Sequence, residues 1–184
     1  MKQLNKLAPW VLTIGLALGS LFVMQGAWIH VKALTGQWLI ENAWLKTERD
    51  GRNYKPWPWA DFYPVAQLKI PSIGESLFVL NTPSGQALAF SPAMTVHVDE
   101  ETGKQIFLIQ AHNDTHFKNL PLLEKGASLH LQSLEYEQDF SVQHTKHVDS
   151  PVLQLNHALE RDRLILSTCD EDDSESRRYL VLGG

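Results

Sequence analysis

The sequence predicts a mainly β domain, a barrel or a sandwich, that follows an apolar N-terminal segment. Short apolar stretches alternate with turn residues beyond residue 60, residues 7–29 carry no charge, and a Pro-Trp-Pro-Trp run separates the two parts. Short strands at modest spacing, bounded by turn residues, are typical of barrels and sandwiches. A length of 184 residues suits one domain with an appendage, and a hydrophobic content of 43% is ordinary for a globular protein.

The uncharged N-terminal run is long enough to cross a bilayer, which needs about 20 apolar residues. A cleaved signal peptide has an apolar region of roughly 7–15 residues and a small-residue exit, whereas the Gly-Ser and Gly-Ala pairs of this run are weak exits. We therefore expect a retained transmembrane anchor over residues 1–30. Lys2 and Lys6 precede the run, so the positive-inside tendency keeps this end in the cytoplasm and sends the rest of the chain across.

Residues 31–54 continue in a helical pattern and are predicted to form a stalk. Apolar residues recur there at spacings near three and four, from Leu34 to Leu45. Trp28, Trp38 and Trp44 suit a membrane interface, where Trp is enriched, and they equally suit packing against the domain. The Pro-Trp-Pro-Trp run breaks the helical pattern, so the domain is expected to occupy residues 55–184.

The domain is predicted to contain eight strands and two helices. The first helix is expected at residues 116–124, and the second at about 152–159, where Pro151 suits a first turn. The strands are expected at residues 65–70, 76–80, 86–90, 105–111, 128–134, 139–148, 163–168 and 178–182.

Composition and missing motifs exclude several classes of function. The net charge is −5 and no basic patch stands out, so nucleic acid is not an expected partner. The chain has no Cys-x-x-Cys pair, no Gly-rich phosphate loop and no Gly-x-Ser-x-Gly elbow. Zinc ribbons, nucleotide-binding enzymes and serine hydrolases of the elbow type are therefore disfavoured.

Cys169 is the only cysteine in the chain and ends an apolar run. A lone cysteine cannot form an intramolecular disulfide, so it is a buried small side chain, half of an intermolecular bridge, or a nucleophile. A nucleophilic cysteine needs a thiolate, which a nearby histidine or positive charge favours. Acyl transfer also needs a donor for the oxyanion. Arg178 opens the next apolar run, and adjacent antiparallel strands would bring it close to Cys169.

His112 is the best placed of the eight histidines, because it follows the apolar run at residues 106–109 and enters a turn. The other histidines, apart from His116, lie in polar or alternating contexts, and most of them are expected to face solvent. His112 and His116, with Asp114 between them, also have a spacing that suits a metal cluster, but no third strong ligand is evident.

Together these residues resemble the sortase family. The segment at residues 111–117 (Ala-His-Asn-Asp-Thr-His-Phe), the later Leu-Ser-Thr-Cys, and the Arg-Tyr-Leu-Val that opens the last strand follow the family's order. The stretch from Lys55 to Asp61, and residues 64–66 and 87–90, look like the Gram-negative branch, called class GN or the marine proteobacterial type. The resemblance covers almost the whole chain.

The resemblance implies a closed eight-stranded β-barrel and a cysteine transpeptidase, in which Cys169, His112 and Arg178 match the three catalytic positions. The family places the arginine directly before three apolar residues, which selects Arg178 over Arg177. Thr168, Asp114 and His116 are then expected to line or brace the substrate site. The implied partners are a secreted protein with a C-terminal Leu-Pro-x-Thr-Gly-like sorting signal and an unidentified amine acceptor.

The implied location is the inner membrane, with a single span and a periplasmic catalytic domain. No cofactor is required by this chemistry. Two other functions remain open: a non-catalytic anchored β-domain that binds a ligand or metal, and a peptidase in which water resolves the intermediate.

The segment between Cys169 and Arg178 is short and acidic, whereas many members of this branch have a longer one. Carboxylates near a thiol disfavour its thiolate. The acidic run is expected to be a solvated loop; calcium bound by Asp170, Asp172 and Asp173 is the alternative, since carboxylates suit this ion.

Overall fold

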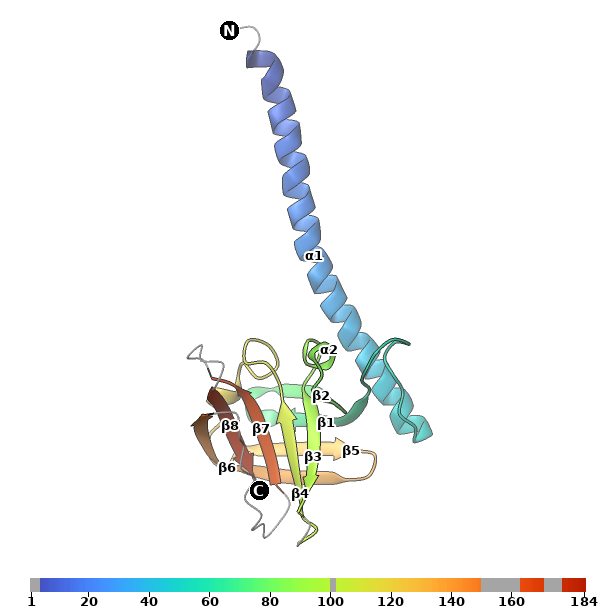
Figure 1. Ribbon diagram of the computed structural model, residues 1–184, viewed down its shortest axis with the longest axis vertical. Coiled ribbons are helices and arrows are strands. Elements are labelled where there is room, and N and C mark those ends of the chain that lie inside the picture. The colour runs from blue at the N-terminus through green and yellow to red at the C-terminus, as the bar shows by residue number, and fades with distance from the viewer. Residues whose placement is uncertain (1–3, 100–101, 150–162, 171–176) are drawn as a thin grey trace. The chain divides into compact units, whose positions relative to one another are not determined.

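The computed structural model describes residues 4–99, 102–149, 163–170 and 177–184. Its elements are drawn in Figure 1. In chain order they are α1 (Leu4–Asp50), β1 (Pro64–Ile70), η1 (Pro71–Ile73), β2 (Glu75–Leu80), α2 (Gly85–Leu88), β3 (Ala93–Val98), β4 (Gln105–Gln110), η2 (Leu120–Leu122), β5 (Ser128–Ser133), β6 (Glu137–Asp149), β7 (Arg163–Cys169) and β8 (Arg177–Gly183).

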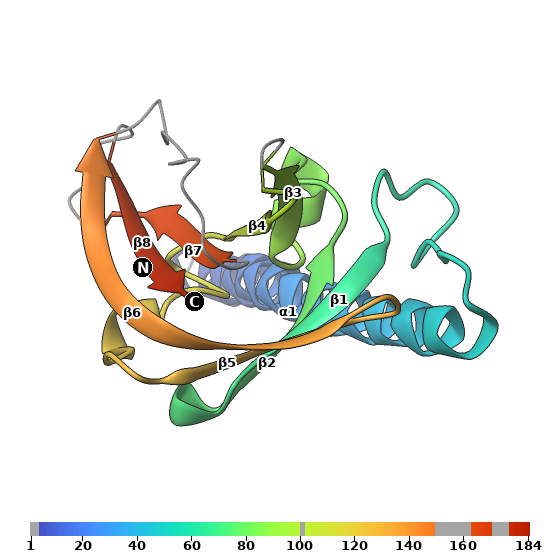
Figure 2. The same ribbon diagram turned by 90° about the horizontal axis from the view of Figure 1, so that it is seen from below.

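The strands form a closed barrel in the order β1-β2-β3-β4-β7-β8-β6-β5, so the predicted closed eight-stranded barrel is confirmed. Most neighbours are antiparallel, but β4 and β7 are parallel, and β2 meets β3 at a single parallel pair. The long strand β6 pairs with β5 along its first part and with β8 along its second part. Figure 2 shows the curve that β6 follows to reach both neighbours.

All but one of the predicted strands are confirmed. Residues 86–90 were expected to be a strand, and this prediction is wrong, because α2 occupies Gly85–Leu88. The hydroxyl of Ser84 accepts a hydrogen bond from the Ala87 amide at 3.0 Å and so caps this short helix. The missing strand is β3, which begins directly after Ser91 and Pro92 and pairs with β4.

The helix predicted at residues 116–124 is also wrong, since only the single 3₁₀ turn η2 forms there. Pro121 lies within that turn and has no amide hydrogen for a longer helix. Phe117, Leu120 and Leu123 are nevertheless buried in the main core. The helix predicted at about 152–159 lies outside the described residues.

Two apolar clusters mark the two faces of β7 and β8. Leu164 and Leu166 of β7, and Val181 of β8, belong to the main cluster inside the barrel, against which Tyr179 packs. Ile165 of β7 and Leu180 of β8 belong to a separate cluster on the outer face. Since successive side chains of a strand point to opposite faces, this alternation fixes the face of every residue near the strand ends.

The helix α1 contributes to two compact units, residues 1–38 and residues 39–184. In the second unit, Ile40, Ala43, Trp44 and Thr47 are buried, which fits the packing interpretation of Trp44. In the first unit, the apolar side chains from Leu12 to Leu34 that the structure describes are exposed, and the helix is long and apolar enough to cross a membrane. The helix runs through residue 30 without a break, and the boundaries 1–30, 31–54 and 55–184 stay predictions.

Candidate active site

The ends of β7 and β8 bring a thiol and a guanidinium together. Cys169 and Arg178 are cross-strand partners in the antiparallel register of these strands. Nη1 of Arg178 donates a hydrogen bond to Sγ of Cys169 at 2.6 Å. Both residues are partly buried, so their charges are screened less than they would be in bulk water. The guanidinium is therefore in direct contact with the atom that acts as the nucleophile when a cysteine is a thiolate.

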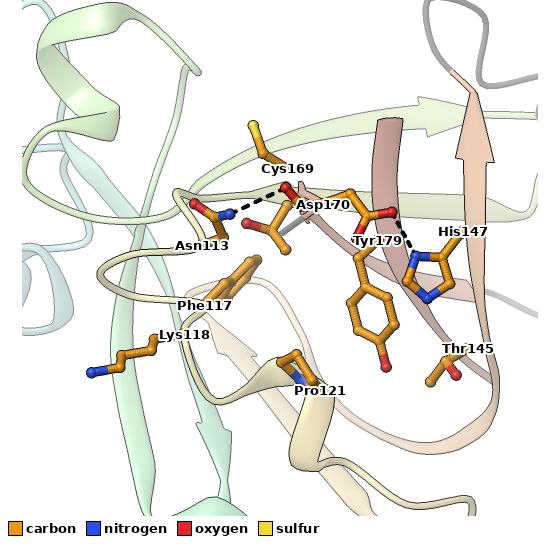
Figure 3. A pocket seen from close by; sticks show the side chains of 10 residues that line it. Asn113, Phe117, Lys118, Pro121, Thr145, His147, Cys169, Asp170 and Tyr179 are labelled. Carbon is orange, nitrogen blue, oxygen red and sulfur yellow. Dashed lines mark hydrogen bonds and ion pairs between the residues drawn. The ribbon is translucent and has the colours of Figure 1, made fainter. Parts of the chain in front are cut away.

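The alternation along β7 and β8 places Cys169 and Arg178 on the outer face of the barrel. Cys169 is four residues after Ile165, and Arg178 is two residues before Leu180, which both belong to the outer cluster. Figure 3 shows the Cys169 sulfur directed away from the side chains of Tyr179 and His147, which lie on the inner side. The contact between Cys169 and Arg178 therefore lies on the outer face.

His112 follows the end of β4, which lies beside β7. The last registered pair is Gln110 with Ser167, and the Ala111 amide donates to the Ser167 carbonyl at 3.2 Å. Ala111 is thus held beside the end of β7, and His112 is the next residue along the chain. The side chain of His112 is exposed, and no hydrogen bond joins it to Cys169 in the described part of the chain.

Thr168 lies on the inner face, directly before Cys169. Its buried hydroxyl donates to the carbonyl of Ala111 at 2.8 Å, which ties the end of β7 to the residue before His112. Thr168 therefore links the two segments that carry the thiol and the imidazole, and it also lines the cavity described below.

Asp114 and His116 lie near His112, since the charges of His112 and Asp114 both act on the His116 imidazole. Asp114 is exposed, and neither residue lines the cavity beside Cys169. Burial lowers the pKa of His116 from its usual 6.5, although a hydrogen bond to the Phe90 backbone and the charge of Glu75 act in the opposite direction. The roles that the sequence assigns to Asp114 and His116 stay predictions.

A cavity of about 330 Å³ opens on the inner side of the strand ends (Figure 3). It is lined by Asn113, Phe117, Lys118, Pro121, Thr145, His147, Thr168, Cys169, Asp170 and Tyr179. The wall thus combines aromatic, cationic and anionic side chains, and Cys169 forms part of it.

Asp170 continues the alternation and faces this inner side. Its side chain is 9% exposed, and Oδ2 lies 2.7 Å from Nδ1 of His147 and 3.8 Å from Nε of Arg177. Arg177 also approaches Asp149 at 3.5 Å. The first carboxylate of the acidic run is therefore paired with basic groups, on the face opposite the Cys169 sulfur.

Sequence reasoning did not single out His147 among the histidines. Its side chain is 52% exposed, yet it contacts both Asp170 and the ring of Tyr179, whose centroid is 5.1 Å from its own. The signal lay in the pairing of β6 with β8, which sets His147 opposite Tyr179 and cannot be read from either strand alone.

Metal ligation is not evident in this region. Within the described ranges, no group of three or more His, Cys, Asp or Glu side chains is arranged to hold an ion. Asp172 and Asp173 lie outside the described residues, so calcium binding there stays a prediction.

The geometry supplies a thiol, a guanidinium and, on an adjacent strand end, an imidazole, which suits acyl transfer through a thioester. The model of the sortase domain family matches residues 68–184, which is more than half of the chain. The chain belongs to the sortase family. Sortases are cysteine transpeptidases, and the barrel described above is their fold.

Individual sortases show the extent of the similarity. Sortase A of Bacillus anthracis is 27% identical over 123 residues, which cover 65% of this chain and 58% of that protein, so less than two thirds of that sortase is matched. The crystal structure of sortase C-1 from Actinomyces oris has a TM-score of 0.56 at 26% identity, covering 67% of this chain and 74% of that one. Sortase D5 of Clostridium perfringens has a TM-score of 0.62 at 15% identity, covering 81% and 96%, and supports the fold alone.

Proposed function

We propose that this sortase is a membrane-anchored transpeptidase that cleaves a C-terminal Leu-Pro-x-Thr-Gly-like sorting signal and transfers the protein to an amine. The observation that carries the proposal is the 2.6 Å contact between Nη1 of Arg178 and Sγ of Cys169 at the paired ends of β7 and β8. A buried bystander cysteine would need no guanidinium at its sulfur.

In the proposed mechanism, the Cys169 thiolate attacks the carbonyl carbon before the scissile bond. Arg178 donates hydrogen bonds to the oxyanion that forms on this carbonyl, and protonated His112 gives its proton to the leaving amine. A thioester remains on Cys169. The acceptor amine loses a proton to His112, attacks the thioester and regenerates the thiolate, so that one peptide bond is broken and one amide is formed.

The finer features of the proposal rest on the sequence. We assign the chain to the Gram-negative branch, class GN, with α1 as a single inner-membrane span, the N-terminus in the cytoplasm and the barrel in the periplasm. The exposed apolar side chains of α1 and its length support the anchor. The partners are a secreted protein with the sorting signal and an amine acceptor of unknown identity, and the reaction requires no cofactor.

The proposal is tested with the purified full chain and a fluorescent peptide that contains a Leu-Pro-x-Thr-Gly signal, with and without an added primary amine. The wild type is expected to form a thioester adduct on Cys169, seen by mass spectrometry, and a joined product when the amine is present. Cys169→Ala is expected to form neither. Cleavage by Cys169→Ala would disprove the assignment of the nucleophile.

The same assay separates the two rival functions. Cleavage that gives only the hydrolysed peptide, at every amine concentration and with every amine class tried, would identify a peptidase. The absence of any adduct, together with slow labelling of Cys169 by iodoacetamide in the folded chain, would identify a non-catalytic binding domain.

A further inference from the structure

Asp170, the residue that follows the candidate nucleophile, makes side-chain and backbone contacts at the end of β7. Asp170 is nearly buried, with a side-chain exposure of 9%, and its Oδ2 meets Nδ1 of His147 at 2.7 Å. Its backbone continues the sheet, because the Asp170 amide donates to the Arg177 carbonyl at 3.1 Å. The Asp170 carbonyl also lies 3.5 Å from Nδ2 of Asn113, the residue after His112.

The contact between Asp170 and His147 joins two strands that are not neighbours. His147 belongs to β6 and Asp170 follows β7, while β8 lies between them in the barrel. The contact passes over β8 at Tyr179, which is the cross-strand partner of both His147 and Thr168. The Tyr179 ring packs against the His147 ring, with a centroid distance of 5.1 Å, and so limits the orientations of the imidazole.

We propose that His147 and Asp170 are positioning residues, which clamp the end of β7 across β8 so that Cys169 faces Arg178. This inference rests on the proposed function, since it concerns the geometry of the same thiol. Asp170 and Cys169 are adjacent and point to opposite faces, so rotation of one about the strand axis turns the other. A hydrogen bond to a carboxylate is stronger than one between neutral groups, and this one acts one residue from the sulfur.

The negative charge of Asp170 and its contact with His147 are expected to change the reactivity of Cys169 in opposite directions. A carboxylate near a thiol disfavours the thiolate, so removing the charge alone would increase the reactivity of Cys169. Loss of the clamp would instead separate Sγ from Arg178 and decrease the reactivity. The charged groups around Cys169 in the described residues are Arg178 of β8, Asp170 itself, the pair of Arg177 with Asp149, Lys118 across the cavity, and the titratable side chains of His147 and His112. The sign of the effect in Asp170→Ala therefore distinguishes positioning from charge.

The experiment measures two properties of the full chain: the rate at which iodoacetamide alkylates Cys169 at neutral pH, and kcat and KM with the signal peptide. Because Cys169 is the only cysteine, alkylation reports on this thiol alone. The variants are His147→Ala, Asp170→Ala, the double variant, and His147→Asn, whose amide nitrogen replaces Nδ1. His130→Ala is the matched control, because His130 also contacts an aspartate on a neighbouring strand, Asp139 of β6, but both partners are exposed and lie far from β7.

We expect each single Ala variant to lower the alkylation rate and to lower kcat by about 10- to 100-fold, the effect of a small misplacement of a reacting group. KM should stay within about twofold, since the outer face that binds the peptide is unchanged. The alkylation rate and kcat of the double variant should be no lower than those of the slower single variant, because both substitutions remove the same contact between Asp170 and His147. His147→Asn should recover most of the loss, and His130→Ala should match the wild type.

Four results would overturn the inference: faster alkylation in Asp170→Ala, additive losses in the double variant, no recovery in His147→Asn, or an equal loss in His130→Ala. Thermal unfolding of each variant identifies any that fails to fold, and His147→Asn then supplies the decisive comparison with the wild type. If the wild type cleaves no peptide but the alkylation pattern is as expected, the clamp stands and the proposed function fails. If peptide is cleaved and the pattern is absent, the function stands and the clamp fails.

Discussion

Arg177 and Arg178 are adjacent in the sequence but contact different groups. Arg178 donates to the sulfur of Cys169 on the outer face, whereas Arg177 approaches Asp149 and Asp170 on the inner face. The alternation of a strand separates their side chains completely. A substitution at one position is therefore not equivalent to the same substitution at the other.

Arg178→Ala is expected to lower kcat by about 100- to 1,000-fold, the usual cost of removing one oxyanion donor. Arg177→Ala should lower kcat far less, because its guanidinium lies on the opposite face from the sulfur. Initial rates with the signal peptide check this prediction. Equal losses in the two variants, or a larger loss in Arg177→Ala, would show that Arg178 is not the oxyanion donor.

His116 is expected to make stability depend on pH. Burial lowers its pKa below the usual 6.5, so below that pH the unfolded chain binds more protons at this residue than the folded chain does. The free energy of unfolding therefore falls as the pH decreases from 6.5 through the lowered value in the folded state. Urea denaturation at pH 7.5 and at about pH 5.5 should show a smaller loss for His116→Gln than for the wild type.

His97→Gln is the control for this measurement, because His97 is exposed on β3. It should lose as much stability as the wild type between the two pH values. If His116→Gln also loses as much, the buried imidazole does not contribute to the pH dependence.

The sequence pattern together with the family resemblance selected the three candidate catalytic residues but not His147. Cys169, His112 and Arg178 stand at the ends of apolar runs, which makes them visible without a structure. His147 stands inside a polar stretch of β6, and its contact with Asp170 depends on the registers of β6 with β8 and of β7 with β8. Two registers between strands that are distant in the chain cannot be deduced from local periodicity.

At the scale of elements, the Thr168 side chain helps to hold the end of β7 to the segment after β4. Thr168 is 3% exposed, and its hydroxyl donates to the Ala111 carbonyl. This bond connects the residue before Cys169 to the residue before His112. Its loss is therefore expected to affect both the stability of the fold and the geometry of the site.

Thr168→Val is expected to lower the free energy of unfolding by about 1–3 kcal/mol, because the buried Ala111 carbonyl loses its donor while the side-chain volume is kept. It should also lower kcat, since the segments that carry Cys169 and His112 are no longer joined by this bond. Thr168→Ser keeps the hydroxyl and is expected to retain kcat. Urea denaturation and initial rates measure both effects, and a normal kcat in a destabilised Thr168→Val would show that the bond is structural alone.

A strand was predicted where the structure has the helix α2, because an apolar pattern over only a few residues does not distinguish the two. Residues 86–90 are mostly apolar, which fits a buried strand as well as a short buried helix. The capping hydroxyl of Ser84 decides for the helix. β3 begins directly after this segment and was not predicted.

At the scale of the whole molecule, α1 contributes to both compact units. Ile40 and Trp44 are 0% and 2% exposed in the second unit, whereas Trp38 is 62% exposed. The last turns of the helix therefore complete a hydrophobic core, together with Phe62, Leu80 and Ala87.

A chain that starts at residue 39 is expected to unfold at the same temperature as the full chain, because the buried part of α1 is kept. A chain that starts at residue 51 loses Ile40 and Trp44 from the core and should be less stable by at least about 5 kcal/mol, since each large buried side chain contributes several kcal/mol. Thermal unfolding in detergent compares the three forms. Equal stability of the two shortened chains would contradict this account.

The closure of the barrel was predictable only through the family resemblance. Alternating patterns indicated β structure but left a barrel and a sandwich equally open. The parallel pairing of β4 with β7, which brings the segment that leads to His112 to the end of β7, joins strands more than fifty residues apart. Such a pairing has no local signature.

β8 is the last of the eight strands along the chain, yet it lies between β6 and β7. During synthesis, the first seven strands emerge before their ring can close, and Cys169 emerges before Arg178. The barrel and the contact of Cys169 with Arg178 are therefore completed in the same step, when Arg177–Gly183 enters the gap. A polypeptide cut short before residue 177 would carry the cysteine but would lack both the closing strand and the guanidinium that the sulfur contacts.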